Sequence, residues 1–139
     1  MSARNAMIFV NIPTKNLDRA ISFWRKLGFE FNPQFTDANA ACLVLSDKGF
    51  VMILNEERFK DFARRPLADV TAATGAILAL SAANRPDVDW LADTAIASGG
   101  SPAAEPMDYG FMYGRSFYDP DGHHFEVFWM DPSHVQPQP

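Results

Sequence analysis

The sequence predicts an α+β fold built from two βαβββ modules within one domain. In each half, a strand-like run and one helical stripe come before three further strand-like runs. The two halves also align on each other at an offset of about 70 residues, as an internal repeat would. Residues that favour turns separate the runs in both halves. Ordinary alternation of strands and helices without duplication is the alternative.

The first module covers about residues 6–55. Residues 7–12 are expected to form a strand that carries Phe9 and Asn11 on one face. Asn16 is placed to cap a helix that Gly28 ends. The apolar stripe of this helix consists of Leu17, Ala20, Ile21, Trp24 and Leu27. The three strands that follow are expected at residues 29–35, 40–45 and 50–54.

A linker at residues 56–74, which starts with a short helix, leads to the second module at about residues 75–131. The tail, residues 132–139, is expected to be loose. The whole chain, residues 1–139, therefore forms one domain with two modules.

The second module repeats the order of the first. Asn84 caps its helix, and Gly99 and Gly100 end it. The apolar stripe of this helix consists of Val88, Leu91, Ala92 and Ala95. Its strands are expected at residues 76–82, weakly near Ala103, and at 111–118 and 124–130.

The hairpin at the end of the second module carries the most informative residue. Asp-Pro-Asp-Gly at positions 119–122 has the composition of a tight turn. In the strand that follows, alternation puts His124, Glu126, Phe128 and Met130 on one face. Because an unpaired carboxylate is costly to bury, Glu126 needs a partner or a function. If a helix covers one face of each sheet, the other faces would curve around a shared cleft that contains Glu126.

Composition limits the classes of partner. The chain has 139 residues, 47% of them hydrophobic and 13% aromatic, so a packed core is expected. A net charge of -5 without a basic run argues against nucleic acid, and no run approaches membrane-spanning length. The single cysteine, Cys42, cannot form an internal disulfide and sits in a strand-like run. We therefore expect a cytoplasmic protein with a buried structural thiol.

Two segments carry a resemblance to a known family. FVNIPTKNLDRAISFWRKLGF near the start and DPDGHHFEVFWMDP near the end resemble the vicinal oxygen chelate superfamily. This superfamily contains glyoxalase I, extradiol dioxygenases, and bleomycin- and fosfomycin-resistance proteins. The resemblance covers about residues 7–132 and implies paired βαβββ modules that form a curved mixed sheet around a ligand cleft. It also implies a homodimer. It does not specify an activity, because fold and function separate in such families.

The resemblance also implies where metal ligands would lie. Metal-dependent members carry four His or Glu ligands, two from each module, and Glu126 matches the last of them. The other positions hold Phe9, Ile77, and Met52 or Ile53. One carboxylate does not supply the ligands that such a metal needs, so no metal site and no cofactor are predicted. A rebuilt site that uses Asn11 and His124 is the alternative.

Without a metal, Glu126 has two interpretations. In the first, it forms an ion pair or hydrogen bond across the sheet with Arg115 or a tyrosine hydroxyl. In the second, it lies among Phe9, Ile77, Met52 and Phe128 and acts as a general base, or donates a hydrogen bond to a ligand.

Residues 108–115, DYGFMYGR, are the second candidate for ligand contact. Two glycines permit close approach of the backbone, and Tyr113 offers a flat ring. Arg115 can clamp a carboxylate or stack on a ring. A bulged strand whose aromatic side chains only pack is the alternative. The residues predicted to contact a ligand are Phe9, Asn11, Met52, Ile77, Tyr113, Arg115, His124 and Phe128.

Three functions are compatible with this sequence. The first is a metal-free protein that binds a small, partly apolar molecule, as the drug-sequestering members of the superfamily do. The second is a metal-dependent enzyme, similar to lactoylglutathione lyase or to an extradiol dioxygenase. The third is an enzyme without metal in which Glu126 is the catalytic base.

Overall fold

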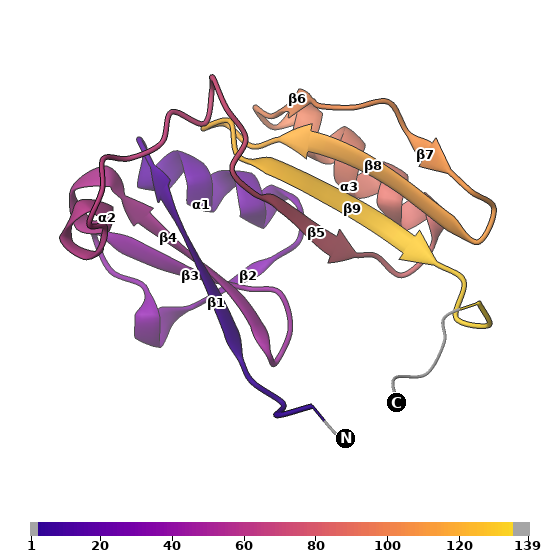
Figure 1. The fold of residues 1–139 in the computed structure, drawn as a ribbon, viewed down its shortest axis with the longest axis horizontal. Helices are drawn as coiled ribbons and strands as arrows, with labels where there is room; N and C mark the ends of the chain where they lie inside the picture. The colour runs from indigo at the N-terminus through magenta and orange to yellow at the C-terminus, as the bar shows by residue number, and fades with distance from the viewer. Residues whose placement is uncertain (1–2, 135–139) are drawn as a thin grey trace. The chain divides into compact units, whose positions relative to one another are not determined.

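A computed structural model describes residues 3–134 of the chain (Figure 1). These residues divide into two compact units, a first unit at residues 3–69 and a second unit at residues 70–134. The division falls inside the segment predicted to be a linker. None of the helices formed by residues 3–134 combines the length and the apolar character needed to cross a bilayer. Residues 135–139 of the predicted tail lie outside the described part of the chain.

The first unit is a four-stranded sheet with its helices in the order βαβββα. Its elements are β1 (Ile8–Thr14), α1 (Leu17–Lys26), β2 (Glu30–Asn32), the short 3-10 helix η1 (Pro33–Phe35), β3 (Ala40–Val44), β4 (Gly49–Asn55) and α2 (Glu56–Phe62). The strand order is β1-β4-β3-β2. Strand β1 runs parallel to β4, and the other neighbours are antiparallel.

Helix α1 forms where its sequence predicts. The side chain of Asn16 accepts a hydrogen bond from the backbone N–H of Arg19 at 3.0 Å, which satisfies one donor of the first turn. Gly28 follows the helix with a φ of +88°, a conformation that glycine adopts without steric cost. Helix α1 contacts β3 and β4 and buries Phe23 and Trp24. One face of this sheet is thereby covered.

The second unit repeats this topology. Its elements are β5 (Ile77–Ser81), α3 (Arg85–Ala97), β6 (Ser101–Pro102), β7 (Met107–Asp108), β8 (Met112–Tyr118) and β9 (His124–Met130). The strand order is β5-β9-β8-β6, with β7 also paired to β8, and β5 runs parallel to β9. In Figure 1, α3 lies along one face of this sheet. Strands β6 and β7 both pair with β8, as β2 pairs with β3, and together take the place of one strand. Counted in this way, both units show the βαβββ pattern, which confirms the predicted α+β class.

Helix α3 buries the stripe that the sequence predicts. Its buried side chains are those of Val88, Leu91, Ala92 and Ala95. Strand β9 alternates as predicted: Phe125 and Val127 are buried, whereas His124, Glu126 and Phe128 are partly exposed. The sheet thus has a covered face on the side of α3 and an open face that carries Glu126.

Two predicted strands differ from the structure. The strand expected at residues 29–35 ends at Asn32, because Pro33 lacks a donor and Asn32 caps η1 through a hydrogen bond from the backbone N–H of Gln34 at 3.0 Å. The weak strand near Ala103 is instead the two short strands β6 and β7, which flank it. Between them, the backbone N–H of Ala104 donates to Oγ of Ser116 at 2.8 Å. The side chain therefore replaces a strand hydrogen bond.

Candidate functional site

The open face of the second sheet, opposite α3, carries most of the predicted site residues of this unit. The pairing of β5, β9 and β8 places them in rows across the sheet. The first row is Ile77, His124 and Tyr118; the second is Ala79, Glu126 and Ser116; the third is Ser81, Phe128 and Gly114. Glu126 therefore lies at the centre of this face.

The carboxylate of Glu126 forms no hydrogen bond or ion pair with the side chains next to it on β5 and β8. Its neighbours on the adjacent strands are the small residues Ala79 and Ser116. Among residues 3–134, the structure shows no hydrogen bond or ion pair of the Glu126 carboxylate. None of the three rows contains Lys or Arg. A partly buried carboxylate on this face is thus left open to a ligand.

Aromatic rings border Glu126 along the strand direction. The rings of Tyr118 and His124 lie 5.3 Å apart at a tilt of 58°. Phe128, two residues beyond Glu126, has only Ser81 and Gly114 as cross-strand neighbours. The face therefore offers flat apolar surface on both sides of one acidic group.

A cavity adjoins this face at the turn between β8 and β9. It has a volume of about 460 Å³, and Tyr118 is part of its lining. The other lining residues are Val70, Thr71, Ala72, Ala73, Thr74, Gly99, Ser101, Asp119, Pro120, Asp121 and Gly122. Tyr118 thus connects the cavity to the row that contains His124.

The turn at residues 119–122 has the predicted conformation. Oδ1 of Asp119 accepts the backbone N–H groups of Asp121, Gly122 and His123 at 2.9 to 3.0 Å. Gly122 has a φ of +103°, which favours glycine. Burial raises the pKa of Asp119 to about 6, against the opposing effect of His123. This carboxyl stabilises the turn that sets the register of β9.

Tyr113 and Arg115 lie on the other face of the sheet from Glu126, because Arg115 pairs with Val127 and not with Glu126. Nη1 of Arg115 reaches Asp93 at 2.8 Å and Asp89 at 3.2 Å, both on α3. The interpretation in which Glu126 forms an ion pair with Arg115 is therefore wrong. Alternation along β8 directs Arg115 toward the helix.

The hydroxyl of Tyr113 donates a hydrogen bond to Asp89 at 2.6 Å. This bond lowers the pKa of Asp89 and raises that of Tyr113, because it stabilises the charged carboxylate and the neutral phenol. Tyr113 therefore ties β8 to α3 beside Arg115, on the covered face of the sheet.

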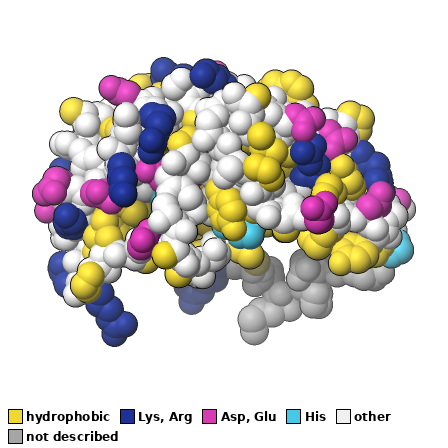
Figure 2. Space-filling model, turned by 90° about the horizontal axis from the view of Figure 1, so that it is seen from above, with side chains coloured by type: hydrophobic (Ala, Val, Ile, Leu, Met, Phe, Trp, Pro, Cys, Tyr) yellow, Lys and Arg dark blue, Asp and Glu magenta, His cyan; other side chains and the backbone are white. Residues whose placement is uncertain are grey.

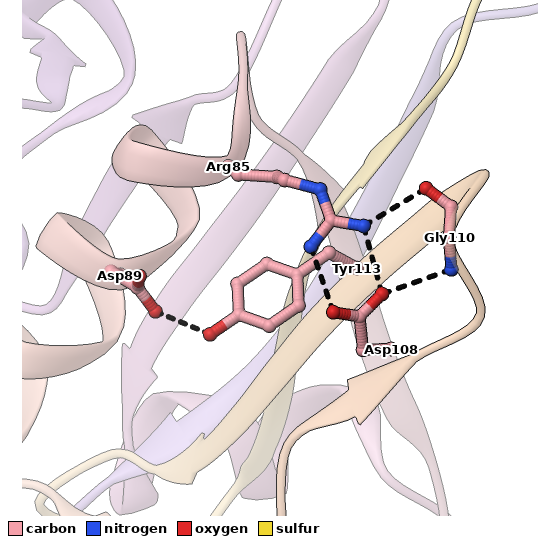
Figure 3. Close-up of polar contacts among 5 residues, drawn as sticks. All are labelled: Arg85, Asp89, Asp108, Gly110 and Tyr113. Atoms are coloured by element: carbon pink, nitrogen blue, oxygen red, sulfur yellow. Dashed lines mark hydrogen bonds and ion pairs between the residues drawn. The ribbon is translucent and has the colours of Figure 1, made fainter.

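Arg85 forms a cluster that the sequence analysis missed (Figure 3). Its guanidinium donates to both carboxylate oxygens of Asp108, at 2.9 and 2.8 Å, and to the carbonyl of Gly110 at 2.9 Å. It also lies over the rings of Tyr113 and Trp129, 5.1 and 5.5 Å from their centroids. The hydrogen bonds from Arg85, together with one from the backbone N–H of Gly110, lower the pKa of Asp108 to about 2. Arg85 thus holds the hairpin between β7 and β8 against the start of α3.

The uncovered face of the first sheet carries the remaining predicted residues. Phe9 stacks on Phe50 with ring centroids 4.7 Å apart, and Asn11 pairs with Met52. The side-chain nitrogen of Asn11 donates to the carbonyl of Phe9 at 3.2 Å. Ile53 is only 1% exposed, so Met52 occupies the open position that the sequence left undecided. This face is mostly apolar.

These residues do not fit the metal site that the resemblance implies. Phe9 and Ile77 have no donor atoms, and Met52 offers only a thioether sulfur. No group of three or more His, Cys, Asp or Glu side chains suited to a metal ion occurs among residues 3–134. The donor chemistry therefore disagrees with a site that needs His and Glu at four positions.

The surface of residues 3–134 drawn in Figure 2 carries no extended basic patch. Basic and acidic side chains are interspersed there. The chain as a whole has a net charge of -5. Electrostatic attraction by the whole protein therefore favours cations over anions.

Solved structures of low sequence identity share the fold. A hypothetical protein from S. aureus is 23% identical with a TM-score of 0.76, and 92% of this chain and 95% of that chain are covered. A glyoxalase/bleomycin resistance protein/dioxygenase family enzyme from Burkholderia phytofirmans PsJN is 19% identical with a TM-score of 0.72, covering 88% and 96%. The fosfomycin resistance protein FosX from Listeria monocytogenes is 17% identical with a TM-score of 0.66, covering 99% and 97%.

A comparison with curated proteins finds no match. A family profile, in contrast, matches residues 7–127, which is most of the chain. The profile describes the same superfamily that the two sequence segments resemble. The chain therefore belongs to the Glyoxalase/Bleomycin resistance protein/Dioxygenase superfamily.

Proposed function

We propose that this protein binds a small, partly apolar molecule on the open face of its second sheet, without a metal ion. The observation that carries the proposal is the chemistry of the four positions at which the family places metal ligands. Three of them hold Phe9, Met52 and Ile77, and only Glu126 remains acidic. Such a surface favours a ligand with apolar area and a polar group.

Two apolar side chains near Glu126 are at least partly exposed and could contact a ligand. Phe128 offers a ring with small neighbours on both sides, and Ile77 is 55% exposed in the row of His124. Their apolar area would be removed from water by a bound molecule. In the first unit, Phe9, Asn11 and Met52 stay predicted contact residues on the basis of their uncovered face.

Tyr113 and Arg115 are assigned a supporting role. Both are held by α3 on the covered face, through Asp89 and Asp93. They would position β8 beside β9 and would not touch a ligand of the open face. Substitution of Arg115 should therefore lower stability more than ligand affinity.

The experiment is a calorimetric binding screen of small aromatic compounds against the wild type and two Phe→Ala variants. Phe128→Ala should weaken binding by about tenfold or more, because a buried ring contact is worth on the order of 1.5 kcal/mol or more. Phe62→Ala removes a ring that is 65% exposed in the other unit, and should have no effect. Equal affinities of all three proteins would contradict the proposed location.

An enzyme without metal is the second candidate function. It is favoured by the unpartnered state of Glu126, since a general base must be free to accept a proton from the substrate. Turnover of any compound that binds, abolished in Glu126→Gln while binding persists, would establish it. A metal-dependent lyase or dioxygenase would instead require stoichiometric metal in the active protein.

The homodimer that the resemblance implies and the cytoplasmic location expected from the sequence stay predictions. We propose that Trp90, which is 51% exposed on α3, lies in the subunit contact. Sedimentation analysis of the wild type and of Trp90→Glu tests it. Dissociation of a dimer in the variant would support that contact, and a monomeric wild type would contradict the homodimer.

A further inference from the structure

The side chains around Glu126 also indicate the charge of the ligand. On both neighbouring strands, the residue opposite Glu126 is small: Ala79 on β5 and Ser116 on β8. Ala79 has no polar side-chain atom, and Oγ of Ser116 already accepts the backbone N–H of Ala104 at 2.8 Å. The sides of the carboxylate are therefore open to a ligand atom.

Among residues 70–134, no lysine or arginine lies on the open face beside Glu126. The basic side chain nearest in sequence, Arg115, points to the opposite face and is bound by Asp89 and Asp93. Arg85 is likewise bound by Asp108 on the side of α3. Within residues 70–134, both arginines are thus engaged away from Glu126, and an ionised carboxylate gains most from a cationic partner.

The apolar neighbours define the second part of the ligand. Phe128 follows Glu126 on the same face of β9, and its cross-strand neighbours Ser81 and Gly114 do not cover its ring. Alternate residues of a strand lie about 7 Å apart, so a fused two-ring ligand that carries an aminomethyl group is long enough to reach from Phe128 to Glu126. A flat ring on Phe128 would hold such an amine beside Glu126.

We propose that the ligand of this face is a cationic aromatic molecule, with a protonated amine or amidine that pairs with Glu126 and a flat ring that packs against Phe128. This inference rests on the proposed function and narrows it to a chemical class. Anionic ligands of the same shape are disfavoured, because the carboxylate of Glu126 repels them and neither Arg85 nor Arg115 lies on this face to offset the repulsion.

The test compares three naphthalene derivatives of one shape: 2-naphthylmethylamine, 2-naphthalenemethanol and 2-naphthoate. The amine should bind about tenfold more tightly than the alcohol, since a charge-assisted hydrogen bond replaces a neutral one. The naphthoate should bind more weakly than the alcohol. In Glu126→Gln, the amine should fall to the affinity of the alcohol, while the alcohol changes less than about twofold.

Two controls accompany the variant. Glu105→Gln makes the same change in net charge at an exposed position of the same unit, and should leave the preference for the amine intact. In the wild type, the amine should also lose affinity between low salt and about 0.5 M salt, whereas the alcohol should not. The salt series tests the charge interaction even if Glu126→Gln does not fold.

The outcomes separate the inference from the proposed function. Equal binding of the three compounds, or a preference for the amine that survives in Glu126→Gln, would overturn the cationic class. If Phe128→Ala still weakened binding by about tenfold or more in that case, the proposed function would stand. Failure of all three compounds to bind the wild type would overturn the proposed function and the inference together.

Discussion

Arg85 and Asp108, 23 residues apart in the chain, form a two-pronged ion pair that joins the first turn of α3 to β7. The carbonyl of Gly110 accepts a further bond from the same guanidinium. The planar guanidinium and the planar carboxylate match each other in geometry as well as in charge. The ammonium group of a lysine would not reproduce this match. The hairpin between β7 and β8 is therefore held from the side of α3.

Replacement of Arg85 should change the titration of Asp108. In Arg85→Met, the pKa of Asp108 should rise from about 2 toward its ordinary value of 3.8, because its strongest hydrogen bond is lost. Since the folded pKa is depressed, this carboxylate stabilises the wild type fully above about pH 4, and less as the pH falls toward 2. Carboxyl-carbon NMR measures the pKa directly.

Asp131 is the internal control for this titration. Its pKa is lowered by hydrogen bonds from Ser133, not from Arg85, so it should not move in Arg85→Met. An unchanged titration of Asp108 in that variant would show that the ion pair does not form in solution.

Asp119→Asn should remove a pH dependence of stability. Because burial raises the folded pKa of Asp119 to about 6, the folded protein binds this proton more tightly than the unfolded chain does. Its stabilising effect is full below about pH 3.8 and is lost as the pH rises through about 6. Urea unfolding should therefore show a decline from about pH 4 to 7 that is smaller in Asp119→Asn. Equal declines in both proteins would contradict the raised pKa.

Gly100→Ala should destabilise the protein because the backbone after α3 leaves no room for a side chain. A Cβ at this position would lie 2.5 Å from the carbonyl oxygen of Tyr118 and 2.9 Å from that of Ala95. We expect the free energy of unfolding to fall by about 1–3 kcal/mol. Gly75→Ala is the matched control, since nothing lies within 4 Å of its Cβ, and it should change stability by less than about 1 kcal/mol. Chemical denaturation of both variants distinguishes them.

Local chemistry explains which parts of the fold could be predicted from the sequence. Asn16 and Asn84 act as caps through bonds to backbone groups three residues away, so a short segment contains the whole signal. The turn at residues 119–122 and the alternation along β9 are equally local. The predicted face of Glu126 was correct for this reason.

The error at Arg115 could have been avoided. The hairpin closes with Tyr118 opposite His124, so counting back along both strands pairs Arg115 with Val127 and Ser116 with Glu126. Register therefore excludes an ion pair across the sheet. Alternation within each strand, taken without the pairing of β8 with β9, does not show this constraint.

The Arg85 cluster could not be predicted in the same way. It requires α3 to be docked on the sheet and β7 to be paired with β8 before the two charges meet. The docking of α3 depends on contacts between distant parts of the chain. Strand β7 has only two residues, which is too short to give a recognisable sequence pattern. The contacts that hold the candidate site thus arise from tertiary packing.

The metal content of the protein, purified without chelator, tests the central claim most directly. Elemental analysis should find zinc, nickel, manganese and iron far below one equivalent per chain. Of the four positions at which the family places metal ligands, only that of Glu126 has a side chain with an oxygen or nitrogen donor. A near-stoichiometric metal that is lost in Glu126→Ala, and retained in Glu105→Ala, would contradict it.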